Sequence, residues 1–388
     1  MRQANLGLDL TTKRTRKREF LDEMNRVVPW GELVALVLPH APEGKRGRPP
    51  FPVETMLRIH FMQQWFTLSD PAMEEALHDV PLFREFAALD NWNMRLPDES
   101  TILRFRHLLE KHELAAQMLA AVNAVLSSKG LLLKAGTVVD ATLIAAPSST
   151  KNASGERDPE MSSTRKGNQW YFGMKAHIGV DAESGLVHTV QGTAANVHDI
   201  VKADALLHGK ETVVYGDAGY RGIQKRTSTK AVEWMVAMCP GKRAALDKDD
   251  ALDRIVNEIE YLKASVRAKV EHPFRVIKLQ FGFAKARYRG LKKNTAQLTT
   301  LFALSNLDGA SQAAENVSGK HRESGDLQTS RSISGPYSFG SQQENDFRDP
   351  PISNVANSQA ENDLFRPSLT NRRSARSERC GVAGELRP

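Results

Sequence analysis

The chain has 388 residues, of which 40% are apolar and 26% are charged. This length and apolar content suit one or two folded domains, whereas no stretch approaches the ~20 apolar residues that a membrane span needs. The first residues lack the continuous apolar segment of a secretory signal. The two cysteines, Cys239 and Cys380, exclude a disulfide framework and a cysteine zinc site. We therefore expect a protein of a reducing cytoplasm without a membrane segment.

The net charge of +7 is concentrated in one part of the chain. Residues 308–388 carry ten Lys and Arg against eleven Asp and Glu, so the excess belongs to residues 1–307. The densest cluster is 263–293, where ten basic residues surround a single acid, Glu271. A cluster of this kind is typical of proteins that bind polyanions. The alternative is a solvated, lysine-rich helix face, and the lone glutamate favours the first interpretation.

The first 130 residues divide into two segments. Residues 1–50 are basic and run into the linker PEGKRGRPPF (42–51), whose Gly and Pro exclude regular structure. Residues 51–130 show apolar residues at helical spacing, and Asp98 or Ser100 is placed to cap a helix. A helical DNA-binding module and a plain helical bundle fit this pattern equally well.

From residue 131 the pattern changes to short strands. GTVVDATLIAAP predicts one strand, the alternating runs around AESG predict a hairpin, and ETVVYGD and AVEWMV predict two more. A short helix opened by Asn196 or Asp199 and a long helical region from Ala251 to Leu307 complete the segment. The expected fold class is α/β, with a mixed sheet and flanking helices over residues 131–307. Residues 308–388 are polar, with few large apolar side chains, and are expected to be a disordered tail.

Three acids stand out by their position. Asp140 lies within the first strand, Asp217 stands between glycines at the end of a later strand, and Glu271 lies in the basic helical region. Their separation along the chain means that only the fold can bring them together. Carboxylates are the ligands that hard divalent cations prefer, and two such cations can stabilise both oxygens of an in-line phosphodiester displacement. Together these residues predict a metal-dependent site for nucleic-acid chemistry.

The residues around Glu271 support this prediction. On a regular helix Arg267, Glu271, Arg275 and Lys278 fall within about 80° of one another, so the cations would flank the acid and contact phosphates. Pro273 requires either a kink or a new helix that begins with the proline in its first turn. Each acid also has an ordinary interpretation as a turn former, a cap or an ion-pair partner, and only their combination favours a site.

Three blocks carry a resemblance to a known family. TVVDATLIAAPSS, VVYGDAGYRG and VRAKVEHPFRVIK closely resemble the acidic blocks of insertion-sequence DDE transposases, in the bacterial branch related to insertion sequences four and five. The resemblance covers roughly residues 50–307. The branch also carries a Tyr, Arg, Glu, Lys signature: Arg267, Glu271 and Lys278 match its spacing, but Ala264 stands where the tyrosine would be. Tyr261, one turn earlier, is the candidate replacement.

This resemblance implies a ribonuclease-H-like catalytic domain after a helical domain. It implies that Asp140, Asp217 and Glu271 hold Mg²⁺, with Mn²⁺ as an alternative, in a two-metal site. It further implies cleavage and strand transfer at the terminal inverted repeats of an insertion sequence, on double-stranded DNA, by a homo-oligomer in the bacterial cytoplasm. Candidate DNA contacts are Arg267, Arg275 and Lys278, with Lys175 on the first hairpin strand and Tyr220 and Arg221 just past Asp217.

Two other functions remain open at this point. The chain could be a catalytically inactive DNA-binding protein derived from a transposase, because the tail after Leu307 is unusual. It could also be a generic ribonuclease-H-type nuclease, which would not require specific end sequences. The presence of all three acids favours the transposase.

Overall fold

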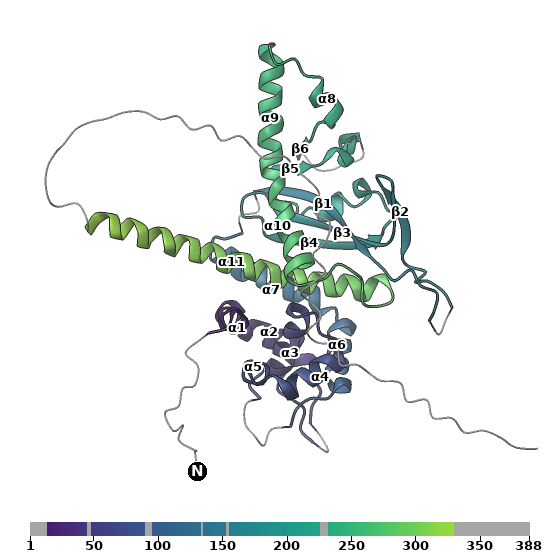
Figure 1. Ribbon diagram of the computed structural model, residues 1–388, viewed down its shortest axis with the longest axis vertical. Helices are drawn as coiled ribbons and strands as arrows, with labels where there is room; N and C mark the ends of the chain where they lie inside the picture. The colour runs from purple at the N-terminus through teal and green to yellow at the C-terminus, as the bar shows by residue number, and fades with distance from the viewer. Residues whose placement is uncertain are drawn as a thin grey trace, which may run out of the picture. The chain divides into compact units, whose positions relative to one another are not determined.

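The structure is a computed structural model, and it describes residues 14–44, 48–89, 95–132, 135–152, 155–225 and 232–329. Side chains are described as far as Ser311. A helical bundle comes first, followed by a mixed sheet with helices (Figure 1). This order agrees with the expected α/β class.

The bundle begins at α1, before the boundary expected at residue 51. Its helices are α1 (Arg16–Val27), α2 (Trp30–Val37), α3 (Val53–Trp65), α4 (Asp70–Asp79), α5 (Pro81–Phe86), α6 (Glu99–Lys111) and α7 (Leu114–Ser128), with a 3₁₀ turn, η1, at Leu38–His40. The first two helices bury Leu21, Met24, Leu33 and Val37, so the basic segment belongs partly to the folded core.

Local sequence accounts for where the helices begin. Asp98 caps α6 by accepting a hydrogen bond from the backbone N–H of Thr101 at 2.7 Å, as expected for an aspartate at this position. Ser69 caps α4 in the same way, with Pro71 in the first turn. α3 is central: ten of its 13 residues are buried, so it forms the inside of the bundle rather than an amphipathic surface helix.

Six strands form one sheet. They are β1 (Gly136–Ala145), β2 (Ser162–Lys166), β3 (Gln169–Asp181), β4 (Val187–Ala194), β5 (Val213–Gly216) and β6 (Glu233–Val236). β1 runs antiparallel to β3, which pairs with β4 and β2, and it runs parallel to β5, which pairs with β6. All the strands predicted from the sequence are present, including the hairpin of β3 and β4.

The segment between β4 and β5 is not the short helix that was expected. It forms two 3₁₀ turns, η2 (Asp199–Val201) and η3 (Asp204–Leu206), and His198 occupies the cap position of the first. Two more 3₁₀ turns, η4 (Ala218–Tyr220) and η5 (Ile223–Lys225), follow β5. Short turns suffice here because the segment buries only a few apolar side chains, among them Ala203 and Leu206.

The long helical region is divided into several pieces. It consists of α8 (Pro240–Ala244), α9 (Ala251–Arg267), a 3₁₀ turn η6 (Ala268–Val270), α10 (Glu271–Arg275), a π-helical turn η7 (Val276–Gln280) and α11 (Leu291–Thr329). The tail was expected from residue 308, but α11 continues to Thr329, and Asp308, Ala310 and Ser311 are buried. The remainder of the expected tail, 330–388, lies outside the described residues.

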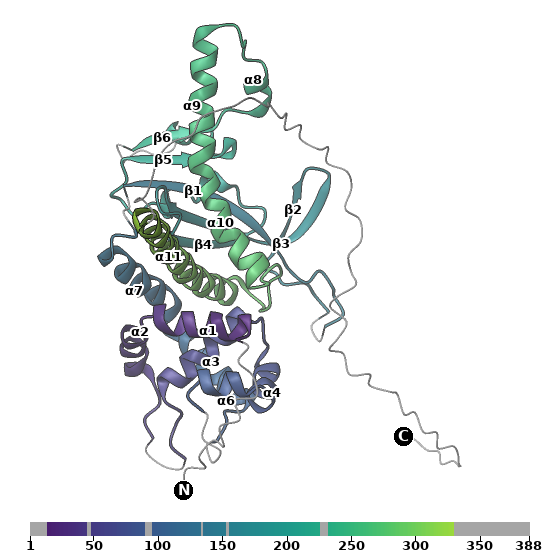
Figure 2. The same cartoon turned by 60° about the vertical axis from the view of Figure 1, so that its left-hand side comes forward.

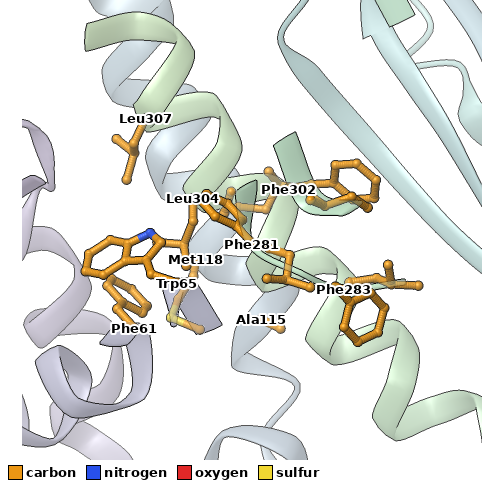
Figure 3. Packing of buried hydrophobic residues seen from close by; sticks show 14 of the residues in the cluster. Phe61, Trp65, Ala115, Met118, Phe281, Phe283, Phe302, Leu304 and Leu307 are labelled. Atoms are coloured by element: carbon orange, nitrogen blue, oxygen red, sulfur yellow. The ribbon is translucent and has the colours of Figure 1, made fainter. Parts of the chain in front are cut away.

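The bundle and the sheet share one core. α11 lies between them (Figures 1 and 2). Figure 3 shows Phe61 and Trp65 from α3 and Met118 from α7 gathered with Phe302 and Leu304 of α11 in one hydrophobic cluster. Residues 51–130 and 131–307, expected as separate domains, are therefore packed against a common helix.

A buried amide fastens this arrangement. Asn306 of α11 accepts a hydrogen bond from the N–H of Val187 at 2.8 Å and donates to the carbonyl of Val187 at 2.7 Å. It also donates to Asn123 Oδ1 of α7 at 2.8 Å. One side chain thereby satisfies both backbone groups of a residue in β4 and joins the sheet to the bundle.

The structure also bears on the membrane question. Among the residues that it describes, no helix is long and apolar enough to cross a bilayer.

Replacing Asn306 with leucine should destabilise the protein strongly. Asn306→Leu keeps the volume but removes the partner of the Val187 N–H and of Asn123 Oδ1, at about 1–3 kcal/mol per buried group. The Val187 carbonyl keeps its hydrogen bond from Asn123 Nδ2 at 3.1 Å. We expect a loss of about 2–5 kcal/mol in the free energy of unfolding, measured by urea titration. Thr300→Val is the control, because the Thr300 hydroxyl bonds only to Ala296 of its own helix. A similar loss in both variants would contradict this role.

Candidate active site

The register of two parallel strands brings the first two acids together. β1 pairs with β5 so that Val139 lies opposite Gly216, and Asp140 and Asp217 are the next residue along each chain. Neighbouring strands are about 4.8 Å apart, so the two backbones place the aspartates side by side where β5 ends. Asp140 itself stays within the sheet, opposite Ile178 of β3.

Asp217 is held by the turn that follows it. Its Oδ1 accepts a hydrogen bond from the N–H of Gly219 at 2.9 Å, which caps η4. A Cβ at Gly216 would lie 3.1 Å from the ring of Tyr220, which packs against the strand end. The glycine before Asp217 is thus required by packing, and Gly222 by its φ of +85°.

Glu271 reaches the same region from the helical segment. It opens α10, with an exposed side chain, while Phe274 and Ile277 are buried in the core. Pro273 lies in the first turn of α10, so the second of the two expected arrangements is the one found.

The carboxyl of Asp140 interacts electrostatically with both of the other acids. Its pKa is raised to about 7, mainly by burial and to a lesser extent by the charges of Asp217 and Glu271. A hydrogen bond from the N–H of Ala141 and the positive charge of Arg267 act in the opposite direction. The fold therefore places two carboxylates and one arginine of the predicted set within electrostatic reach of Asp140.

Lys278 is bound to the strand that carries Asp140. Its Nζ donates to Thr142 Oγ1 at 2.7 Å and to the Leu143 carbonyl at 3.0 Å. Thr142 is two residues beyond Asp140 and therefore lies on the same face of the sheet. Burial and Lys166 lower the pKa of Lys278, and Glu271 raises it. Thr142 was missed in the sequence, although the alternation along β1 indicates its position.

The segment that carries Arg267, Glu271, Arg275 and Lys278 is not the single regular helix that was expected. Residues 267–280 pass through the end of α9, a 3₁₀ turn, α10 and a π-helical turn, so a constant 100° per residue does not apply. Glu271, Arg275 and Lys278 nevertheless line one open hollow of about 590 Å³ together with Thr142. A π-turn of this kind often marks a functional segment.

Three of the candidate DNA contacts are bonded to other protein groups or buried. Lys175 is on the opposite face from Asp140, where its Nζ donates to Asp199 at 2.9 Å and to the carbonyl of Val197 at 2.8 Å. Arg221 donates to Cys239 Sγ at 2.7 Å. Tyr220, a candidate phosphate contact, is fully buried. Lys175 is therefore engaged in an ion pair rather than presented to DNA, and its partner Asp199 is not a helix cap.

Carboxylate oxygens suit a hard cation such as Mg²⁺. Burial is the main cause of the raised pKa of Asp140, and the charges of Asp217 and Glu271 add a repulsion that a cation would relieve. The donor chemistry therefore fits the expected metal. Within the described ranges, however, no three His, Cys, Asp or Glu side chains are close enough to form a ready-made metal site.

Comparison with known proteins supports the same assignment. Residues 132–307 match the family described as the transposase DDE domain, and residues 9–108 match a second transposase domain, DUF772. The chain belongs to the DDE transposases. The first match contains all three acids, and the second covers most of the bundle.

One solved structure is also similar. The cryo-EM structure of a piggyBac transposase synaptic complex with hairpin DNA shares 10% identity, with a TM-score of 0.38, over 78% of this chain and 74% of that one. At this distance no residue is carried from one protein to the other.

The mixed sheet, in which β1 stands between antiparallel β3 and parallel β5, agrees with the expected α/β class, and its ribonuclease-H-like character stays a prediction. The branch related to insertion sequences four and five stays a prediction. Ala264 and Tyr261 are both exposed on α9, and the replacement of the signature tyrosine by Tyr261 also stays a prediction.

The raised pKa of Asp140 predicts a stability that falls with pH in EDTA. Between about pH 4 and about pH 7 the unfolded chain releases a proton that the folded protein retains, so the free energy of unfolding decreases as pH rises. At 1.36 kcal/mol per unit the penalty reaches about 4 kcal/mol above this window. Asp140→Asn should remove it, raising stability in urea titrations at alkaline pH but hardly below about pH 4.

Asp204→Asn is the matched control, because Asp204 is an exposed acid of the same domain. If Asp140→Asn stabilises the protein equally at both pH values, or no more than Asp204→Asn does, the pKa of Asp140 is not raised in the folded state.

Proposed function

We propose that this transposase cleaves DNA at the terminal inverted repeats of an insertion sequence and joins the freed 3′-hydroxyl to target DNA. Asp140, Asp217 and Glu271 hold Mg²⁺, which Mn²⁺ can replace. Two bound cations would stabilise the attacking and leaving oxygens of an in-line displacement. The single observation that supports the proposal most is the register of β1 and β5, in which Asp140 and Asp217 directly follow the paired residues Val139 and Gly216.

The chain's own residues have distinct roles in this proposal. The strand register and the turn at Gly219 fix the two aspartates, while Glu271 approaches from α10. Lys278 positions the helical segment on β1. Arg275, exposed beside Glu271 in the open hollow, and Arg267, close to Asp140, are placed to bind phosphates on either side of the scissile bond.

The partner in this proposal is double-stranded DNA, both the paired ends and the target, bound by a homo-oligomer in the bacterial cytoplasm. The concentration of positive charge at 263–293 supports a DNA partner, since counterion release from phosphates provides much of such binding. Exposed Arg221, despite its contact with Cys239, remains a further candidate contact.

Asp217→Asn should abolish cleavage while DNA binding persists. The amide keeps the size and the hydrogen bond to Gly219 but lacks the charge that a divalent cation needs. The measurement is strand cleavage of a duplex carrying the element's ends, in Mg²⁺ and in EDTA, alongside a gel-shift assay. Asp204→Asn should cleave like the wild type.

Full cleavage by Asp217→Asn would exclude this site. Specific binding without cleavage by the wild type would instead support an inactive DNA-binding protein. Cleavage of any duplex irrespective of its ends would indicate a generic nuclease.

The salt dependence of DNA binding should distinguish Arg275 from Lys175. The logarithm of the affinity falls with the logarithm of salt concentration by about 0.9 per neutralised phosphate. Arg275→Gln should therefore reduce the slope by about one. Lys175→Gln should leave the slope unchanged, because Lys175 is already paired with Asp199. Equal changes in both variants would contradict the assignment.

A further inference from the structure

α9 carries an apolar stripe that nothing in the described structure covers. The exposed large hydrophobic side chains of the described residues number nine, and five of them lie on this one helix. Leu252, Ile255, Ile259 and Leu262 are 72%, 55%, 45% and 59% exposed. At 100° per residue they fall within about 80° of one another. This is a contiguous stripe and not a set of scattered surface residues.

The stripe is distinct from the side of α9 that holds the helix in place. Glu260 is buried and accepts a hydrogen bond from the N–H of Met238 at 2.8 Å. Lys263 pairs with Glu260 at 2.8 Å and donates to the carbonyl of Val236 in β6 at 3.4 Å. Glu260 is turned about 120° from the middle of the stripe, and Lys263, at its edge, about 60°. Figures 1 and 2 both show α9 rising beyond the sheet, with its outer turns projecting.

The spacing of the stripe identifies the kind of partner. Steps of three, four and three residues are those of the a and d positions of a coiled-coil heptad. A seam this narrow suits one other helix, whereas a helix packed on a sheet or in a bundle presents a wider apolar face. The same stripe on two copies can form a self-complementary, isologous two-fold interface.

The charges beside the stripe favour a parallel pair. With Leu252 at position a, Glu258 falls at g and Lys263 at the following e, and these positions meet across a parallel pair. Lys263 has three N–H donors, of which two are used within its own chain. In an antiparallel pair the two copies of Glu258 would meet near the centre and repel each other.

We propose that α9 is a dimerisation helix, which pairs in parallel with α9 of a second copy of this chain through Leu252, Ile255, Ile259 and Leu262. The helix is preformed, since Asp250 caps it and Glu260 and Lys263 fasten it to the sheet. Pairing therefore does not have to order the helix, which matters because a seam of four residues is too short for two free peptides. The proposal does not depend on catalysis.

The test is sedimentation velocity of the full chain without DNA. The wild type should be a dimer, and Ile255→Lys with Ile259→Lys should raise the dissociation constant at least about tenfold, because it places like charges in the seam. Tyr261→Lys with Ala264→Lys is the matched control: it adds the same charge to exposed positions on the other side of the same helix. Circular dichroism checks that α9 stays folded in each variant.

A cysteine variant tests the orientation. In a background of Cys239→Ser and Cys380→Ser, Ile259→Cys should form a disulfide-linked dimer under mild oxidation, since a parallel pair sets the two copies of residue 259 opposite each other. Tyr261→Cys should not.

A monomeric wild type, or a stripe variant that dimerises as the wild type does, would overturn the proposal. So would cross-linking that requires Ile255→Cys in one copy and Ile259→Cys in the other. Because no DNA or cleavage is involved, these outcomes are separate from those that test the catalytic site.

Discussion

The parallel pairing of β1 with β5 is the constraint on which the site depends. A slip of one residue would turn Asp217 to the other face of the sheet, away from Asp140. The register is fixed by a small core on the opposite face, in which Val139 and Val214 pack with the buried Tyr220. Tyr220 lies against Gly216 and holds the end of β5. Apolar packing on one face thus determines where two carboxylates stand on the other.

In the site, the carboxylates repel one another, while Lys278 attaches the segment that carries Glu271 to β1. Burial raises the pKa of Asp140, and the charges of Asp217 and Glu271 add to the shift; perturbed carboxylates of this kind are common at functional sites. The segment that carries Glu271 cannot simply move away, because Lys278 fastens it to Thr142 and Leu143 of the strand that carries Asp140. Lys278 therefore has a structural role in addition to its charge. Its hydrogen bonds to β1 limit how far Glu271 can lie from Asp140.

The joint site of the three acids stays a prediction, but sequence reasoning correctly placed the strands, because alternation and turn residues are local signals. It failed where the decisive contact is distant. The ion pair of Lys175 with Asp199 and the burial of Tyr220 depend on which face of the sheet each residue occupies. The 3₁₀ and π-helical turns on either side of α10 follow from packing on β1, and Pro273 alone indicated a break without fixing its form. The position of α11 between bundle and sheet depends on the hydrogen bonds between Asn306 and Val187, which lie 119 residues apart in the sequence.

That position of α11 changes how the helical region is understood. A bundle and a DNA-binding module fitted the sequence equally, but a module that swings freely would need its own core. Here Gln64 of α3 bonds to Gln297 of α11 at 3.0 Å, and Asn123 of α7 bonds to Asn306 of the same helix. The bundle shares a hydrophobic cluster with the sheet, and both belong to one compact unit. The helical region is therefore not an independent module joined to the sheet by a linker, but part of the same folded core as the strand that carries Asp140.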